Sequence, residues 1–154
     1  ISDRIETNSA YSKHENQLID LNQEGLESEL IYSVDNQSLS LFSNFSKSKK
    51  TDGRSQSRRP DLSYGTKFNK KFTSNLIGPF NFNLNYKYMG KYIDYNGGNV
   101  SVKSTDMINI NLTKKLFGND ISLAITNLLN ERYERPATYS QDGRQLRLSL
   151  KKIY

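Results

Sequence analysis

Residues 80–88 alternate strictly between large apolar side chains and polar ones. The even positions hold Phe, Phe, Leu, Tyr and Tyr, whereas the odd positions hold Asn, Asn, Asn and Lys. Because successive side chains of a β-strand point to opposite faces, this pattern predicts a strand with one apolar face and one polar face. Such a strand is typical of a transmembrane β-barrel, and it is also found in a soluble β-sandwich.

Similar alternation recurs along the chain, and no helical period is present. We therefore predict an all-β fold of antiparallel, up-and-down strands joined by consecutive hairpins. Eight strands are expected, at residues 1–7, 16–34, 38–46, 61–72, 80–88, 104–115, 121–128 and 144–154. The polar segments 8–15 and 94–103 are expected to be loops.

The expected connections differ in length in a regular way. Those around 35–37, 73–79 and 116–120 are short, whereas those at 47–60, 89–103 and 129–143 are long. Outer-membrane barrels alternate in this manner, because their periplasmic turns are short and their outer loops are long. A soluble sandwich has no reason to do so. The pattern therefore favours a transmembrane barrel, in which Tyr86 and Tyr88 would mark the outer membrane interface.

Composition narrows the remaining choices. The chain of 154 residues contains no cysteine and a single histidine, His14, so neither a disulfide framework nor a thiolate metal site is expected. No apolar run is long enough for a transmembrane helix, although the mean hydropathy of −0.76 is compatible with strands that face water on one side. The net charge of +6 comes from scattered basic residues, so nucleic acid is not expected as a partner.

The C-terminal third contains motifs that resemble a known family. Residues 124–134, and Gly143 with Arg144 before a last strand that closes on Tyr154, resemble the final two strands of TonB-dependent outer-membrane receptors. The motif residues in the first segment are Asn127, Leu128, Tyr133 and Glu134. The nearest members are the vitamin B12 and iron-chelate receptors. We interpret Asn127–Tyr133 as a structural segment that ends a strand and shapes a loop, and we expect Gly143 to supply a special φ.

This resemblance implies a larger protein in the outer membrane of a Gram-negative bacterium. Its barrel would have about 22 strands and a plugged lumen. Residues 1–154 would form the C-terminal portion, and the chain is expected to be a piece that starts inside a strand. The partners implied are outer-membrane lipid and lipopolysaccharide, the protein's own plug domain and, through the plug, the TonB complex. The function implied is uptake of a scarce nutrient such as an iron chelate or cobalamin.

Several side chains are candidates for contact with a ligand. Arg54, Arg58 and Arg59 could bind an anionic ligand or lipopolysaccharide phosphates, or could simply be solvated. Tyr92, Asp94, Tyr95 and Tyr139 could line an outer vestibule, although tyrosines also form interfacial girdles. Polar side chains that alternate with the apolar ones are expected to line the lumen and touch the plug. They are Glu27, Glu29, Asn81, Asn83, Asn85, Lys87, Asn109, Asn111 and Arg147.

No catalytic, metal or cofactor site is expected. Glu27 and Glu29 share a face and could act as an acid–base pair, but no nucleophile, histidine or metal cluster accompanies them. Two alternatives stay open. One is a soluble β-sandwich that binds carbohydrate or acts as an adhesin, with its apolar face packed on a second sheet. The other is a small barrel closed by these eight strands alone.

Overall fold

The computed structural model describes residues 5–7, 14–16, 20–51, 53, 58–95 and 97–152, with side chains described from residue 20 onward. The elements of regular secondary structure in these residues are all β-strands. The described segments include no helix with the length and apolar character needed to span a membrane. Arg54 and Tyr154, named above as a ligand candidate and as the closing aromatic residue, lie outside the described residues.

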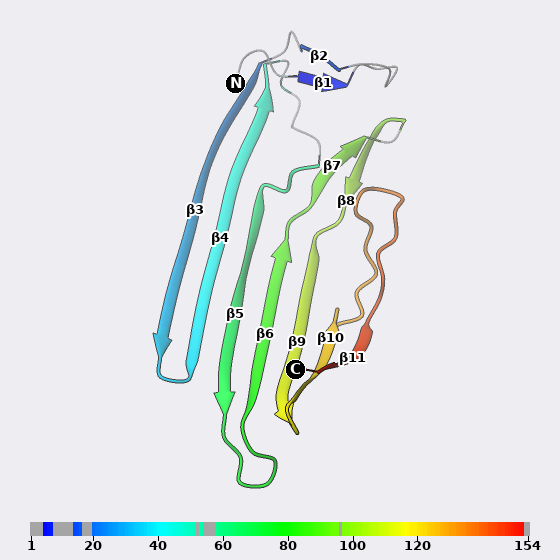
Figure 1. The fold of residues 1–154 in the computed structure, drawn as a ribbon. Helices are drawn as coiled ribbons and strands as arrows, with labels where there is room; N and C mark the ends of the chain where they lie inside the picture. Colours follow the sequence, from blue (N-terminus) through cyan, green and yellow to red (C-terminus); the bar gives the residue numbers. More distant parts are fainter. Residues whose placement is uncertain are drawn as a thin grey trace.

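Seven strands form one antiparallel sheet, in which each strand lies beside its neighbours in sequence apart from one inserted hairpin. The strands are β3 (Leu21–Val34), β4 (Gln37–Lys50), β5 (Leu62–Phe72), β6 (Phe80–Met89), β9 (Thr105–Leu116), β10 (Asn119–Thr126) and β11 (Gln145–Lys152). Figure 1 shows them as a single layer with its short turns at the lower end. The prediction of an all-β antiparallel meander is confirmed.

The remaining four strands form two small sheets. The pair β1 (Ile5–Thr7) and β2 (His14–Asn16) is separate from the large sheet, so the expectation that 1–7 begins the same meander is wrong for its described part. The second pair is β7 (Tyr92–Tyr95) and β8 (Asn99–Val102), which occupies a segment expected to be a loop. There Val100 and Val102 alternate with polar residues, and this short period-two pattern supports the strand β8.

Cross-strand register places most apolar side chains of the seven strands on one face, while Ile31, Phe42 and Met107 lie on the opposite face. In one row across the sheet, Phe68 pairs with Leu84, Leu84 with Ile110, Ile110 with Ile125, and Ile125 with Leu146. A shift of one residue in the pairing would move the apolar side chains of a strand to the opposite face. Because the apolar side chains of neighbouring strands coincide in the observed register, that register is well determined. The two faces predicted from the alternation are therefore confirmed.

No second layer covers the apolar face within the described residues. Leu148 on the edge strand β11 is 74% exposed, Leu30 on the other edge strand β3 is exposed to a similar degree, and Leu41 on the inner strand β4 is also exposed. A soluble sandwich would bury these side chains against another sheet. The sheet is also open, because β3 and β11 form its two edges and are not paired with each other. The fold is therefore neither a sandwich nor a small closed barrel.

The opposite face carries the polar side chains expected there. Asn83 lies between Asn69 and Asn111 in one row, and Asn85 pairs with Asn109 in the next. The two β3 carboxylates on this face accept hydrogen bonds from the neighbouring strand, Glu29 from the Ser40 hydroxyl at 2.8 Å and Glu27 from the Asn44 amide. These bonds give Glu27 and Glu29 structural partners across the β3–β4 pair.

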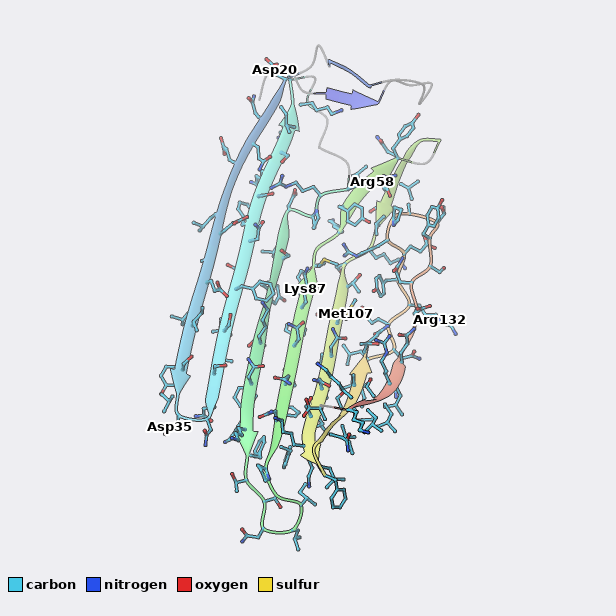
Figure 2. All side chains as sticks on the ribbon, viewed as in Figure 1. Asp20, Asp35, Arg58, Lys87, Met107 and Arg132 are labelled. Atoms are coloured by element: carbon cyan, nitrogen blue, oxygen red, sulfur yellow. The ribbon has the colours of Figure 1, made fainter. Side chains whose placement is uncertain are left out.

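The two ends of the sheet differ in their connections. Turns of two to seven residues, at 35–36, 73–79 and 117–118, define the short-turn end. Segments 51–61, 90–104 and 127–144 define the long-connection end. Figure 2 marks the short-turn end with Asp35 and the long-connection end with Asp20, at opposite ends of β3. The predicted alternation in connection length is confirmed.

Aromatic side chains on the apolar face differ between these ends. Toward the long-connection end Tyr64 stacks on Tyr88 with ring centroids 4.7 Å apart, and it lies 6.2 Å from Tyr86. Toward the short-turn end Phe72 stacks on Phe80 at 5.2 Å. On β5 and β6, tyrosine therefore lies toward the long-connection end of the apolar face and phenylalanine toward the short-turn end, which agrees with the expected outer position of Tyr86 and Tyr88.

Candidate functional site

The three long connections converge at one end of the sheet. The β7–β8 hairpin packs against the 127–144 segment, and both lie at the same end as residue Arg58 of the 51–61 connection (Figure 2). A small apolar core of Tyr92, Val102 and Ala137, with Val100 packed against it, holds the hairpin to the segment. This small core fixes the hairpin against the 127–144 segment at the long-connection end.

Asp94 connects all three segments. Its side chain is 1% exposed, and its Oδ1 accepts a hydrogen bond from Arg58 Nε at 2.7 Å. Its Oδ2 accepts from the backbone N–H of Ala137 at 2.8 Å, while the N–H of Tyr95 also donates to Oδ1. One buried carboxylate therefore joins the hairpin to both neighbouring connections.

Opposing effects act on the ionisation of Asp94. Burial disfavours the charged form, but the Arg58 guanidinium and the N–H groups of Ala137 and Tyr95 stabilise it more strongly. The net result is that the pKa of Asp94 lies below its ordinary value. Asp94 is consequently a stable anion near neutral pH and holds its three donors under physiological conditions.

Arg135 is the second charged group in this core. Its guanidinium carbon lies 5.2 Å from the centre of the Tyr92 ring, a cation–π arrangement. Burial lowers the pKa of Arg135 from its ordinary value. Its Nε and Nη2 atoms are buried and have no hydrogen-bond partner among the described residues. Neither Arg135 nor Ala137 was expected from the sequence, because nothing in a polar connection marks which residues will turn inward.

Asn127 organises the start of the 127–144 connection. It has a φ of 51°, and its side chain is buried. Its Oδ1 accepts from Glu131 N at 3.0 Å, while its Nδ2 donates to the carbonyls of Glu131 and Asp142 at 2.9 and 3.2 Å. Its own N–H donates to Asn109 Oδ1 at 2.9 Å. Asn127 directly follows β10, and its hydrogen bonds hold the start of the 127–144 connection.

The other motif residues extend this arrangement. Leu128 N donates to the Ile108 carbonyl at 2.8 Å, which keeps the turn against β9. The Tyr133 carbonyl accepts from Gln141 N at 2.9 Å, and Glu134 Oε2 accepts from Thr138 N at 2.7 Å. The segment thus folds back on itself as a hairpin-like excursion above the sheet.

Gly143 differs from the expectation. It does not adopt a positive φ, so the predicted special φ is wrong. A Cβ at this position would lie 2.7 Å from Asn130 Oδ1, the atom that accepts a hydrogen bond from Arg144 N at 2.9 Å. A larger residue here would force the Asn130 amide to shift and would disturb its hydrogen bond with Arg144 N.

The predicted ligand residues fall into two groups. Tyr92 and Asp94 are buried in the packing between connections, and Arg58 is bound to Asp94. Arg59 donates from Nε to Ser46 Oγ at 2.9 Å and from Nη1 to Gln23 Oε1 at 3.0 Å, so it ties the connection to β3 and β4. Tyr95 is 56% exposed and Tyr139 is 66% exposed, so a ligand could reach both.

A groove of about 1050 Å³ lies between the end of β8 and the 127–144 connection. Its lining combines both charges with polar groups, including Lys103, Arg132, Glu134 and Gln141. Across the described residues, no group of three or more His, Asp or Glu side chains is arranged to hold a metal ion. The arrangement suits binding by hydrogen bonds and charge.

Comparison with known proteins identifies the architecture. Neither a family model nor a curated protein matches the sequence. The ferripyoverdine receptor of the outer membrane of Pseudomonas aeruginosa, solved with ferripyoverdine bound, matches with a TM-score of 0.77 and 15% identity. The FpvAI–pyocin S2 complex matches with a TM-score of 0.78 and 15% identity. Each match covers 97% of this chain and 23% of the solved chain, and it shows that the fold is that of a segment of a receptor barrel.

Proposed function

We propose that this chain forms part of the barrel wall and outer connections of a TonB-dependent outer-membrane receptor in a Gram-negative bacterium. The intact receptor would take up a scarce nutrient and would not be an enzyme. The described segment would contribute lipid-facing wall, lumenal wall and ligand-accessible surface. A plug domain and the TonB complex would supply the movement that opens the path.

One observation carries this proposal. The sheet has a mainly apolar face on one side and a mainly polar face on the other, and all its long connections lie at one end. Because no second layer covers the apolar face of the described sheet, a strand such as β6 is best accommodated with lipid on one side and water or a polar plug on the other. The similarity to receptor barrels over 97% of the chain agrees with this arrangement.

An iron–siderophore complex is the nutrient that we favour. The solved receptor with the same fold carries ferripyoverdine, and the sequence motifs resemble both iron-chelate and cobalamin receptors. The exposed Tyr95 and Tyr139 and the mixed charges of the groove suit a large polar ligand with aromatic or anionic groups. Cobalamin is the competing nutrient.

Location and barrel formation can be tested directly on the full-length protein. We expect it in the outer-membrane fraction, and we expect it to migrate faster on SDS gels without heating than after heating, because folded barrels resist SDS. Recovery of the native protein in the soluble periplasmic fraction would refute the proposal.

Uptake tests the nutrient. A strain that lacks the gene should lose transport of radioactive iron from one of a panel of ferric siderophores, while transport of labelled cobalamin is unchanged. Substitution of Tyr95 and Tyr139 by alanine should weaken binding of that ferric siderophore by about ten-fold, since exposed aromatic anchors contribute strongly to binding. Tyr32→Ala is the matched control, because Tyr32 is 58% exposed but lies at the short-turn end. Equal effects of all three substitutions would contradict the assignment.

A further inference from the structure

Two turns at the short-turn end carry apolar side chains at their tips. Leu76 in the β5–β6 turn is 96% exposed and Phe117 in the β9–β10 turn is 92% exposed, with Ile77 also exposed. Turns that face water are normally built from polar residues and glycine. Within the described residues nothing covers these side chains.

Phe117 is also unfavourable for the turn itself. It has a φ of 50° and precedes Gly118, whose φ is 75°, in a two-residue hairpin turn. The first position of such a turn is usually Asn or Gly, and a bulky side chain there is conformationally costly. Phe117 gains no burial within the described chain to offset this cost, so an external apolar environment would account for it.

The two turns lie next to each other. Their strands β6 and β9 are paired, and the Lys114 ammonium donates a hydrogen bond to the Ile77 carbonyl. Leu76, Ile77 and Phe117 are therefore carried by adjacent turns, and these three side chains are termed the apolar patch. This patch continues the apolar face of the sheet, where Phe72 stacks on Phe80 immediately above the β5–β6 turn.

Lysines border this patch on the same face. By register Lys70 lies opposite Phe82, Lys114 opposite Ile121, and Lys152 opposite Asn119. Each is within two residues of the short-turn end of its strand as described. The acidic groups at this end are Asp35, in the β3–β4 turn, and Asp120, which lies on the polar face opposite Lys115 and Lys151. The outward border of the apolar patch is therefore basic.

We propose that the short-turn end binds anionic phospholipid headgroups, with the tips of the two turns inserted at the boundary between headgroups and acyl chains. The proposal rests on the transmembrane placement proposed above. Apolar side chains flanked by lysines are the combination that holds a surface at an anionic interface. Lys70, whose ammonium lies 5.1 Å from the centre of the Phe72 ring, can extend along the apolar surface toward the headgroups.

Lipid selectivity of the full-length receptor in phosphatidylcholine vesicles provides the first test, with spin-labelled phosphatidylglycerol as the probe. The wild type should prefer this lipid to spin-labelled phosphatidylcholine. The outward triple variant K70Q/K114Q/K152Q should weaken the preference by about five-fold per site, the equivalent of about 1 kcal/mol per lysine. The matched inward variant K71Q/K115Q/K151Q removes the same charge from the polar face at this end of the sheet and should leave the preference unchanged.

Insertion of the turns is tested by a fluorophore attached to a cysteine introduced by F117C. Emission should be quenched by nitroxides on the acyl chains and protected from aqueous iodide, whereas N36C in the polar β3–β4 turn should show the reverse. The variant F117N should reduce the preference for phosphatidylglycerol. Because Asn-Gly is the favoured sequence for this type of turn, the loss of preference would not result from misfolding of the turn.

Two results would overturn the inference. One is equal loss of lipid preference in the inward and outward lysine variants, and the other is iodide quenching at position 117 as strong as at position 36. Strong iodide quenching at position 117 would indicate that the patch faces water and contacts a periplasmic protein instead of lipid. If the receptor does not form an SDS-resistant barrel in vesicles, the proposed function itself fails. An SDS-resistant barrel without lipid preference would refute only this inference.

Discussion

Leu84 offers the sharpest test of whether lipid meets the apolar face. It is the fifth of the ten residues of β6 and lies in the row between Phe68 and Ile110. Ten residues at about 3.4 Å each, tilted by about 45°, rise about 24 Å, which matches an apolar band about 25 Å tall. Leu84 therefore lies near the middle of the membrane, whereas Tyr88 lies near its outer border.

The expected cost of a charge follows from this depth. Lys at position 84 should destabilise the barrel by about 2–4 kcal/mol, and Lys at position 88 by about 0–1 kcal/mol. Each lysine variant is compared with the alanine variant at the same position, because Tyr88→Ala alone removes the 4.7 Å stack on Tyr64. The difference between lysine and alanine isolates the cost of the charge.

Guanidinium-induced unfolding of the full-length receptor in phospholipid vesicles measures these differences. Asn85→Lys is the matched control, since Asn85 is the next residue along β6 and lies on the polar face opposite Lys67 and Asn109. It should change the free energy of unfolding little. Equal charge costs at positions 84 and 88, or a cost at position 85 as large as at 84, would refute the assignment of the faces to lipid and lumen.

Three further substitutions test the packing. Gly65→Ala should weaken the β4–β5–β6 pairing by more than about 1 kcal/mol, because its Cβ would meet the Tyr86 carbonyl and lie 2.6 Å from Phe42 Cζ; unchanged stability in guanidinium would contradict this. Asp94→Asn should lower the free energy needed to open the long connections by about 1–3 kcal/mol, which would be measured as faster proteolysis within 51–61 and 127–144. Because the folded pKa of Asp94 is lowered, the stability that ionised Asp94 gives to the long connections should be complete above the unfolded pKa of about 3.9 and should be lost as the pH falls through the folded pKa. Equal protection from proteolysis at pH 7 and at pH 3, about one unit below the unfolded pKa, would contradict this. Asn127→Ala removes three side-chain hydrogen bonds at a residue with a positive φ, so it should increase proteolytic cleavage within 127–144 alone. An equal increase in cleavage within 51–61 would indicate general unfolding and would contradict a local role for Asn127.

Alternation alone predicted most of the large sheet. The two faces of β6 were readable because side chains alternate with a period of two, and the same reasoning fixed the faces of β9 and β11. The alternation in connection length predicted which end would carry the long segments. The small β7–β8 hairpin was missed, because four-residue strands in a polar segment give too few repeats for the period to stand out.

The candidate site was less accessible to sequence reasoning. Tyr92, Asp94, Tyr95 and Tyr139 were all plausible ligand contacts from residue type alone. The structure separates them, since the first two are buried between connections and the last two are exposed. Whether a polar loop residue turns inward depends on the segment that packs against it, and that segment can be as distant in sequence as Ala137 is from Asp94.

Local periodicity and short hairpins were enough to predict the strands of the large sheet, its two faces and the order of its strands. Only the tertiary structure decided that the apolar face has no covering layer, that the sheet stays open at β3 and β11, and that Asp94 joins three connections. It also replaced the expected φ at Gly143 by a close contact with Asn130. These features depend on contacts between residues far apart in sequence, which no local pattern encodes.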